Sequence, residues 1–226
     1  ASKIIAEHAI KNKMKKLIFF SSGSVYGLKK EKKVTEDLKL NPISVYNKTK
    51  MIAERVFLSY KDKLDVTCLR PATVCGVSNR LRLDVTVNKL TFDAFYRKKI
   101  FVDGGGQVRP NIHLEDIVRI VDHFALSKKK FKYNIYNIGF ENLSILQIAK
   151  KVKKKINVEI FINKAKDIRS YRQDSSRLLR TGFRPKYNVE LAINQLLSYF
   201  KKHKLKKFGT NNFNLKKMKK LKIDKI

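Results

Sequence analysis

Short apolar runs alternate along this chain with longer segments of helical periodicity, and this alternation constrains the possible folds more than any other feature. Residues 17–20 (Leu-Ile-Phe-Phe) and 66–69 (Val-Thr-Cys-Leu) have the length and composition of buried strands. Residues 42–60, between them, carry apolar side chains at helical spacing. Strands joined by helices of ten or more residues form βαβ units, and the resulting parallel sheet is covered on both faces. The sequence therefore predicts an α/β fold around a parallel sheet.

The same patterns assign most of the remaining chain to alternating strands and helices. Further helices are expected at residues 2–13, 84–97, 113–126, 144–155 and 189–202, and further strands at residues 100–102, 133–138 and 158–162. From about residue 205 onward, the lysine-rich tail is expected to be frayed helix or disordered. Removal of this tail is therefore expected to leave any activity unchanged.

Composition adds a strong positive charge. The 226 residues include 52 Lys and Arg against 19 Asp and Glu, which gives a net charge of +33. A charge of this size suggests a polyanionic partner such as nucleic acid. However, 40 of these cations are Lys and only 12 are Arg, and they are scattered along the chain. Sequence-reading proteins rely on Arg, so we favour a compositional origin, such as AT-rich coding, over a dedicated nucleic-acid role.

Several classes of protein are excluded by simple patterns. No apolar run approaches the roughly 18 residues that span a bilayer, and the opening residues read as an amphipathic helix rather than a signal peptide. Cys68 and Cys75 match no disulfide framework or zinc-site spacing, and the four histidines are dispersed. We therefore expect a soluble, cytoplasmic protein with no bound metal.

Tyr46 and Lys50 are four residues apart, so they share one face of the helix expected at residues 42–60. A tyrosine phenol ordinarily has a pKa near ~10. A lysine ammonium one helical turn away lowers such a pKa and allows proton exchange with a substrate hydroxyl. A solvated lysine beside a half-buried tyrosine is the structural alternative. Ser22 favours the chemical interpretation, because it follows the strand at residues 17–20, where open α/β sheets place their ligand crevice.

Several separated segments, in a consistent order, carry a family resemblance. They are residues 17–27 (Leu-Ile-Phe-Phe-Ser-Ser-Gly-Ser-Val-Tyr-Gly), 46–50 (Tyr-Asn-Lys-Thr-Lys), 69–76 (Leu-Arg-Pro-Ala-Thr-Val-Cys-Gly), 105–116, 136–139 and 167–172. Over roughly residues 2–200 the chain resembles the extended short-chain dehydrogenase/reductase family, the NAD-dependent nucleotide-sugar epimerases and dehydratases. The resemblance implies a Rossmann-like, doubly wound parallel sheet with a small C-terminal α/β substrate lobe.

The resemblance also implies roles for individual residues. Ser22, Tyr46 and Lys50 match the catalytic triad of the family. Contacts with NAD or NADP are implied for Ser21, Tyr46, Lys50 and Pro71, and contacts with the nucleotide-sugar substrate for Ser22, Ser24, Thr73, Asn88, Arg109 and Arg172. Arginines suit the diphosphate of such a substrate because they pair bidentately with phosphate oxygens.

The chain departs from the family at its start. The family begins with a strand and a Gly-x-x-Gly-x-x-Gly turn that holds the cofactor pyrophosphate. No such motif occurs here, and residues 104–106 (Gly-Gly-Gly) fit a turn better. The chain is therefore expected to be the C-terminal part of a longer protein. Residues 1–76 would complete a cofactor domain, residues 77–203 would form a substrate lobe with the last sheet strands, and residues 204–226 the basic tail.

These observations favour an NAD(P)-dependent epimerase or reductase of a nucleotide-activated sugar, working through a transient keto-sugar with Tyr46 as acid and base. Dehydration is not favoured, because dehydratases carry an Asp-Glu pair where this chain has Gly23 and Ser24. Related enzymes pair the helices that match residues 2–13 and 43–60 in a homodimer, which makes Ile52 and Phe57 candidate contacts. The alternative is a catalytically incompetent fragment, or a binding protein that uses its basic surface for polyanions.

Overall fold

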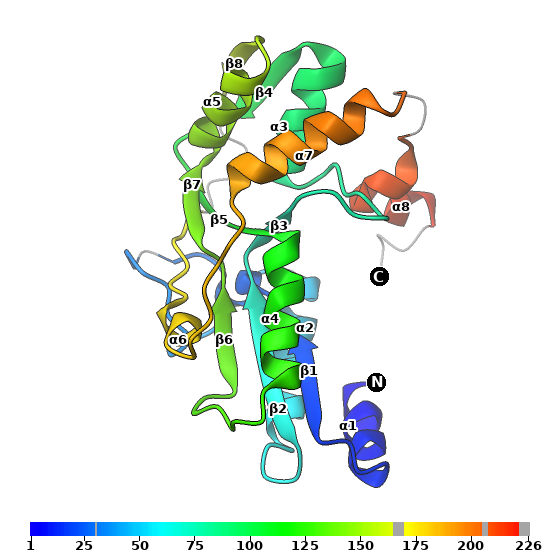
Figure 1. Ribbon diagram of the computed structural model, residues 1–226, viewed down its shortest axis with the longest axis vertical. Helices are drawn as coiled ribbons and strands as arrows, with labels where there is room; N and C mark the ends of the chain where they lie inside the picture. The colour runs from blue at the N-terminus through cyan, green and yellow to red at the C-terminus, as the bar shows by residue number, and fades with distance from the viewer. Residues whose placement is uncertain (30, 165–169, 205–207, 222–226) are drawn as a thin grey trace.

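A parallel sheet of three strands, in the order β1-β2-β6, organises the computed structural model, which describes residues 1–29, 31–164, 170–204 and 208–221 (Figure 1). The strands are β1 (Lys16–Phe20), β2 (Asp65–Pro71) and β6 (Ile135–Ile138). Phe20 lies opposite Leu69, and Pro71 lies opposite Ile138, so the three carboxyl ends meet at one edge of the sheet. Open α/β sheets bind their ligands outside this edge.

Helices cover both faces of this sheet, as the buried strand patterns predict. Alternate residues of β2 point to opposite faces. Val66 and Cys68 pack in one cluster with Phe57, between β2 and the helices α1 (Ser2–Lys11) and α2 (Val45–Leu58). Leu69 packs instead with Phe124 of α4 (Leu114–Leu126). The strand is therefore buried from both sides, between two helical layers.

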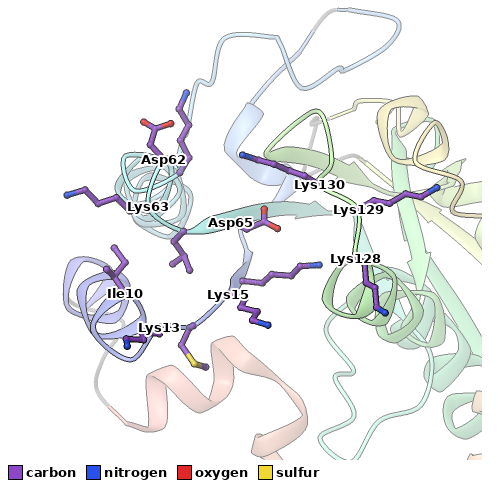
Figure 2. Close-up of a pocket in the computed structure, with 13 residues that line it drawn as sticks. Ile10, Lys13, Lys15, Asp62, Lys63, Asp65, Lys128, Lys129 and Lys130 are labelled. Atoms are coloured by element: carbon purple, nitrogen blue, oxygen red, sulfur yellow. The ribbon is translucent and has the colours of Figure 1, made fainter.

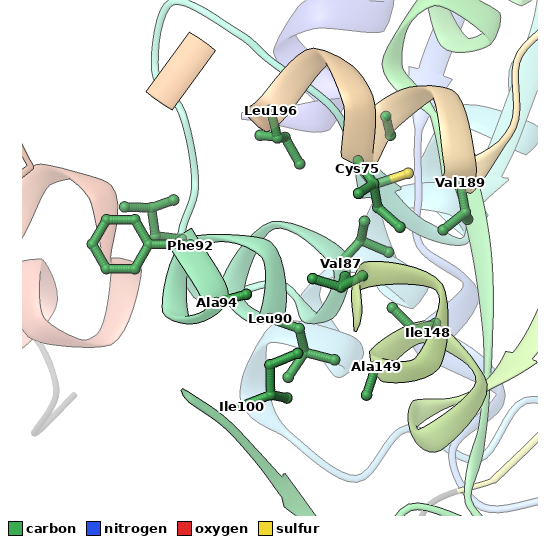
Figure 3. Close-up of a cluster of buried hydrophobic side chains, with 14 of the residues drawn as sticks. Cys75, Val87, Leu90, Phe92, Ala94, Ile100, Ile148, Ala149, Val189 and Leu196 are labelled. Carbon is green, nitrogen blue, oxygen red and sulfur yellow. The ribbon is translucent and has the colours of Figure 1, made fainter. Parts of the chain in front are cut away.

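A second lobe lies beyond the carboxyl edge of the sheet (Figure 1). It holds a three-stranded sheet in the order β3-β5-β7, in which β3 (Thr73–Cys75) is parallel and β7 (Glu141–Ser144) antiparallel to β5 (Val108–His113). A separate parallel pair consists of β4 (Lys99–Asp103) and β8 (Glu159–Asn163). The helices α3 (Thr86–Phe92), α5 (Ile145–Lys155) and α7 (Val189–Lys201) contribute to a buried core that includes Leu90, Ile148 and Leu196 (Figure 3).

Short elements connect and extend these lobes. The 3-10 helix η1 (Gly23–Tyr26) follows β1, and a π-helical turn, η2 (Asp93–Arg97), extends α3. The turn ends at Lys98, whose backbone is left-handed with a φ of 56°. The last third of the chain contains α6 (Ser176–Leu179), η4 (Thr210–Asn212) and α8 (Asn214–Lys220).

The C-terminal segment, residues 208–221, is ordered against the second lobe. Phe208 packs with its ring centroid 5.6 Å from that of Phe92 and 5.7 Å from that of Phe200. The side-chain amide of Asn212 donates a hydrogen bond to the carbonyl oxygen of Leu81 at 2.8 Å. The expectation of a frayed or disordered tail is therefore wrong for these residues, because aromatic side chains between the lysines reach the core.

The predicted α/β class, with a parallel sheet and a second lobe, is confirmed, although several boundaries differ. The helix expected from residue 42 begins at Val45, because Ser44 is its N-cap and accepts a hydrogen bond from the backbone N–H of Asn47 at 3.2 Å. The single helix expected over residues 84–97 is α3 followed by the π-helical turn. The sequence patterns do not predict β3, β5 or β7, which are three to six residues long.

Both cysteines are buried and lie outside any disulfide. Burial raises the pKa of the Cys68 and Cys75 thiols to about 12, so both thiols stay protonated at neutral pH. Over the described ranges, no three His, Cys, Asp or Glu side chains are grouped so that they could hold a metal ion. Within the same ranges, no helix combines the length and the apolar character that crossing a bilayer requires.

Candidate active site

A cavity of about 610 Å³ opens where the carboxyl edge of the parallel sheet meets the second lobe. Six residues singled out in the sequence line it, namely Ser22, Ser24, Tyr46, Pro71, Thr73 and Asn88. They come from the turn after β1, from α2, from the end of β2, from β3 and from α3. The parallel strands thus bring together residues that are far apart in the sequence.

Tyr46 and Lys50 lie on one face of α2, as their spacing predicts. The Lys50 ammonium is 5.9 Å from the centroid of the Tyr46 ring and 5.0 Å from that of Phe19. It donates a hydrogen bond of 2.8 Å to the carbonyl oxygen of Phe20, the last residue of β1. Burial lowers the pKa of Lys50. Tyr46 is 56% exposed and lines the cavity, whereas Lys50 is not among the lining residues.

The hydroxyl of Ser22 belongs to a short hydrogen-bonded chain. Ser24 donates its single hydroxyl hydrogen to Oδ1 of Asn47 at 2.8 Å. The two serine oxygens are 2.7 Å apart, so Ser22 must be the donor in the bond between them. Ser22 Oγ also accepts from the backbone N–H of Ser24 at 3.2 Å, which leaves one lone pair. In this arrangement Ser22 can accept a hydrogen bond from a substrate hydroxyl.

Ser21, a predicted cofactor contact, lies behind this surface. Its backbone N–H donates to the carbonyl oxygen of Leu69 at 2.8 Å, which ties the end of β1 to β2. Its side chain is buried and does not line the cavity. Among the described residues, Ser21 Oγ has no hydrogen-bond partner.

Asn88 faces the cavity, but its amide is engaged within the chain. Its Oδ1 accepts from the backbone N–H of Gly76 at 3.1 Å, and its Nδ2 donates to the carbonyl oxygens of Gly76 at 3.2 Å and Arg82 at 2.9 Å. Both amide hydrogens are therefore used. Asn88 therefore holds the loop between β3 and α3 in place, and this role is additional to any contact that it makes with substrate.

The structure does not bring the two predicted phosphate-binding arginines to this cavity. Arg109, on β5, lines a smaller neighbouring cavity together with Asp84 and Phe101. Arg172 lines a third cavity, beside Lys32 and Asp174. Residues 167–169 of the same sequence motif lie outside the described residues.

Other residues that the sequence analysis did not single out also line this cavity. They include Arg80 and Arg82 before α3, Tyr171, and the C-terminal Asn214 and Met218. The alternation Arg-Leu-Arg-Leu over residues 80–83 was a usable signal for the two arginines, because burial of the leucines leaves both arginines exposed. Asn214 and Met218 reach the cavity only through tertiary packing, for which the sequence carries no signal.

A buried ion pair supports the strand ends beneath the cavity. The Arg70 guanidinium, on β2, pairs with the Glu54 carboxylate, on α2, and both side chains are almost fully buried. Arg70 also donates to the hydroxyl of Tyr26 at 2.8 Å, and this hydroxyl donates to Oδ1 of Asn137 at 2.7 Å. Burial raises the pKa of Tyr26 to about 12, so its phenol remains a donor. The network joins η1, α2, β2 and β6 where the cavity opens.

A different cavity, of about 460 Å³, lies at the amino-terminal edge of the sheet (Figure 2). Its lining includes eight lysines and two aspartates, which are Lys13, Lys15, Lys16, Lys61, Lys63, Lys128, Lys129, Lys130, Asp62 and Asp65. The loops before β1, β2 and β6 and the first residues of β1 and β2 supply them. The fold thus gathers these lysines around one cavity although they are separated in the sequence. None of the predicted site residues lines this cavity.

Comparison with known proteins agrees with this architecture. Residues 1–139 match the model of the NAD-dependent epimerase/dehydratase family. Over 164 residues the chain is 32% identical to a UDP-glucose 4-epimerase of Lactobacillus helveticus, which covers 62% of this chain and 49% of that protein. The chain spans about half the length of the curated relatives it matches.

Solved structures show the same fold. The UDP-glucuronic acid 4-epimerase of Bacillus cereus, in complex with UDP-glucuronic acid and NAD, superposes with a TM-score of 0.77 at 26% identity, over 89% of this chain and 66% of that one. An NAD-dependent NDP-hexosamine 5,6-dehydratase of tunicamycin biosynthesis gives a TM-score of 0.80 at 21% identity, over 91% of this chain and 69% of that one. The expected Rossmann-like fold is confirmed by these likenesses.

Proposed function

This chain belongs to the NAD-dependent epimerase/dehydratase family, and from this membership we propose that the whole protein is an NAD(P)-dependent epimerase, or reductase, of a nucleotide-activated sugar. One observation carries the proposal. Ser22 and Tyr46 line the same cavity at the carboxyl ends of the parallel strands, with the Lys50 ammonium beside the tyrosine ring. A binding protein that used only its basic surface would have no need of this arrangement.

In the proposed reaction, the residues of this chain orient the sugar and move a proton. Tyr46 removes the proton of a sugar hydroxyl while the carbon that bears it is oxidised, and returns a proton when the keto-sugar is reduced. Lys50 supplies positive charge next to the Tyr46 ring. Ser22, Ser24 and Thr73 are proposed substrate contacts because they line the cavity.

The residues at the end of β1 fit the nicotinamide half of NAD or NADP. Ser21 Oγ is a buried hydroxyl with no hydrogen-bond partner among the described residues, and Lys50 is anchored at the neighbouring Phe20 carbonyl. We propose that Tyr46 and Lys50 bind the ribose and that Pro71 lies beside the nicotinamide. The cofactor, when bound, accepts and returns the hydride.

The hydrogen bonds of Ser24 favour epimerisation or reduction over dehydration. Elimination of water needs an additional acid and base near the catalytic hydroxyl, and this chain places Gly23 and Ser24 there. Ser24 Oγ is committed to Asn47 and Ser22. A serine hydroxyl in such a chain has neither the charge nor the pKa of a carboxylate.

We propose that the whole protein is a cytoplasmic enzyme of carbohydrate biosynthesis and that it forms a homodimer through α1 and α2. Exposed apolar side chains on these helices support the dimer, since Ile4 is 70% and Ile52 is 55% exposed. Phe57, the other candidate contact, is 4% exposed and packs inside the chain, so it is unavailable to a partner.

Replacement of Tyr46 by phenylalanine in the whole protein tests the proposed function. We expect turnover of a UDP-sugar to fall by about 10²- to 10⁴-fold, because only the transferable proton is lost. Tyr60→Phe is the matched control, since its hydroxyl contacts Glu7 on α1 and lies outside the cavity lining. A Tyr46→Phe protein that kept more than half of the wild-type activity would show that Tyr46 is not the acid and base.

A further inference from the structure

The C-terminal segment is fixed to the stretch of chain that precedes α3. Besides the aromatic packing of Phe208, two hydrogen bonds join the segment to residues 81–83. The backbone N–H of Leu83 donates to the carbonyl oxygen of Asn212 at 2.8 Å, and the Asn212 amide donates to the carbonyl oxygen of Leu81 at 2.8 Å. The position of the segment is therefore set by the same residues that carry the two cavity-lining arginines.

Residues 80–83 present their side chains alternately to the core and to the cavity. Leu81 and Leu83 are 2% and 0% exposed, within the core of the second lobe. Arg80 and Arg82 are exposed and line the active-site cavity. Because the two leucines are buried in the core and alternate with the arginines, their burial holds both guanidinium groups at the cavity.

Asn214 and Asp84 orient these guanidinium groups. Arg80 Nη2 donates to Asn214 Oδ1 at 2.7 Å, and Arg82 Nε donates to Asp84 Oδ1 at 2.9 Å. The two contacts are joined, because the backbone N–H of Asn214 donates to the other oxygen of Asp84 at 2.8 Å. Each guanidinium has five N–H donors, and each uses one of them here.

Met218 extends this wall by one helical turn. It is four residues after Asn214 on α8, so the two side chains share a face of the helix. Both line the active-site cavity, and Met218 is 42% exposed. The segment thus contributes two side chains to the cavity lining, the polar Asn214, which is hydrogen-bonded to Arg80, and the apolar Met218.

We infer that Asn214 and Met218 of the C-terminal segment form part of the substrate site, and that Asn214 positions Arg80 to bind, together with Arg82, the diphosphate of the nucleotide sugar. This inference rests on the proposed function and extends it to residues beyond the family match, which ends at residue 139. Two features favour a diphosphate. Arginine pairs bidentately with phosphate oxygens, and Arg80 and Arg82 line the cavity of Ser22 and Tyr46, whereas Arg109 and Arg172 line others.

Calorimetric titration of the protein with UDP tests the inferred site. We expect Arg80→Ala to raise the Kd for UDP about tenfold, the effect of losing one charge-assisted phosphate contact. Arg80→Lys should give a smaller increase, because it keeps the charge and loses the planar pair of donors. Lys219→Ala is the matched control. It removes one exposed charge from α8, outside the cavity lining, and should leave the Kd unchanged.

Asn214→Ala separates a positioning role from a structural one. We expect the KM of the whole protein for a UDP-sugar and the Kd for UDP to rise together, by roughly threefold, with kcat and the melting temperature unchanged. A lower melting temperature with an unchanged Kd for UDP would show that Asn214 only anchors the segment, and would overturn the inference.

The inference and the proposed function can fail separately. If Tyr46→Phe abolishes turnover while Arg80→Ala leaves KM and the UDP Kd at wild-type values, the enzyme proposal stands and the inferred diphosphate site is wrong. If no nucleotide sugar is turned over but UDP binds and this binding depends on Arg80 and Asn214, the inferred site stands and the enzyme proposal falls. A wild-type protein that does not bind UDP overturns the inference.

Discussion

Lys50 holds its ammonium in a partly buried position between two aromatic rings and the end of β1. Because burial lowers the pKa of Lys50, its charge is lost at a lower pH than that of an exposed lysine. If the charge supports proton transfer by Tyr46, activity should fall as pH rises through this lowered pKa.

The variant Lys50→Arg tests this dependence. Arginine stays protonated throughout the accessible range, so the alkaline fall in kcat/KM of the whole protein should move to higher pH, even if the rate at neutral pH is lower. Profiles of kcat/KM against pH for the wild type and the variant provide the measurement. Identical alkaline limbs would show that another group is responsible.

Glu54 and Arg70 form the most deeply buried ion pair described above, with side chains 2% and 3% exposed. We expect Glu54→Ala to lower the free energy of unfolding by about 3 to 5 kcal/mol, because the arginine is left buried without its counter-charge. Glu7→Ala, which breaks an exposed pair with Lys3, should cost less than about 1 kcal/mol. Urea unfolding of the wild type and the two variants measures the loss of unfolding free energy in each variant. Equal losses would contradict the argument from burial.

Individual site residues were predictable where sequence spacing alone sets their placement. Tyr46 and Lys50 share a helix face, and Ser22 follows a buried strand, so the structure places Ser22 and Tyr46 in one cavity. Asn88 and Arg109 were not predictable in this way. The side-chain amide of Asn88 donates its hydrogen bonds to the carbonyl oxygens of Gly76 and Arg82, and Arg109 lines another cavity. Both placements depend on how the second lobe packs.

The helix α2 presents Tyr46 from its first turn, immediately after the N-cap Ser44. We expect Ser44→Ala to cost about 1 kcal/mol of stability and also to lower turnover, because fraying of this turn displaces the tyrosine. Ser144→Ala removes the N-cap of α5, far from the cavity lining, and should cost a similar amount of stability without changing turnover. Equal activities of the two variants would argue against a role for the cap in placing Tyr46.

At the scale of elements, long amphipathic helices and fully buried strands were predictable, whereas short strands were not. β2 is covered on both faces, and its central residues 66–69, Val-Thr-Cys-Leu, form a short and mostly apolar run. β3 has three residues and β7 is half-buried and polar, so neither carries a period long enough to recognise. Both segments become strands because they pair with β5, and this pairing depends on the tertiary structure rather than on the local sequence.

The proposed homodimer concerns the molecule as a whole. Ile52→Asp places a charge on the exposed apolar face of α2 and should shift the sedimentation coefficient of the protein toward the monomer. Leu126→Asp is the control, since Leu126 is 78% exposed at the end of α4, which covers the other face of the sheet from α1 and α2. A dimer that survives Ile52→Asp and substitutions of the other exposed α1 and α2 residues would rule out this interface.

The walls of the candidate active-site cavity come from segments that are far apart in the sequence, from Ser22 to Met218. During translation, a nascent chain therefore presents its serine and tyrosine before α8 has left the ribosome. A ligand that contacts the whole cavity stabilises only chains whose synthesis has passed Met218, because binding to the native state alone shifts the folding equilibrium. Substrate in the cell would thus protect chains that extend past Met218 from proteolysis and leave shorter ones to be degraded.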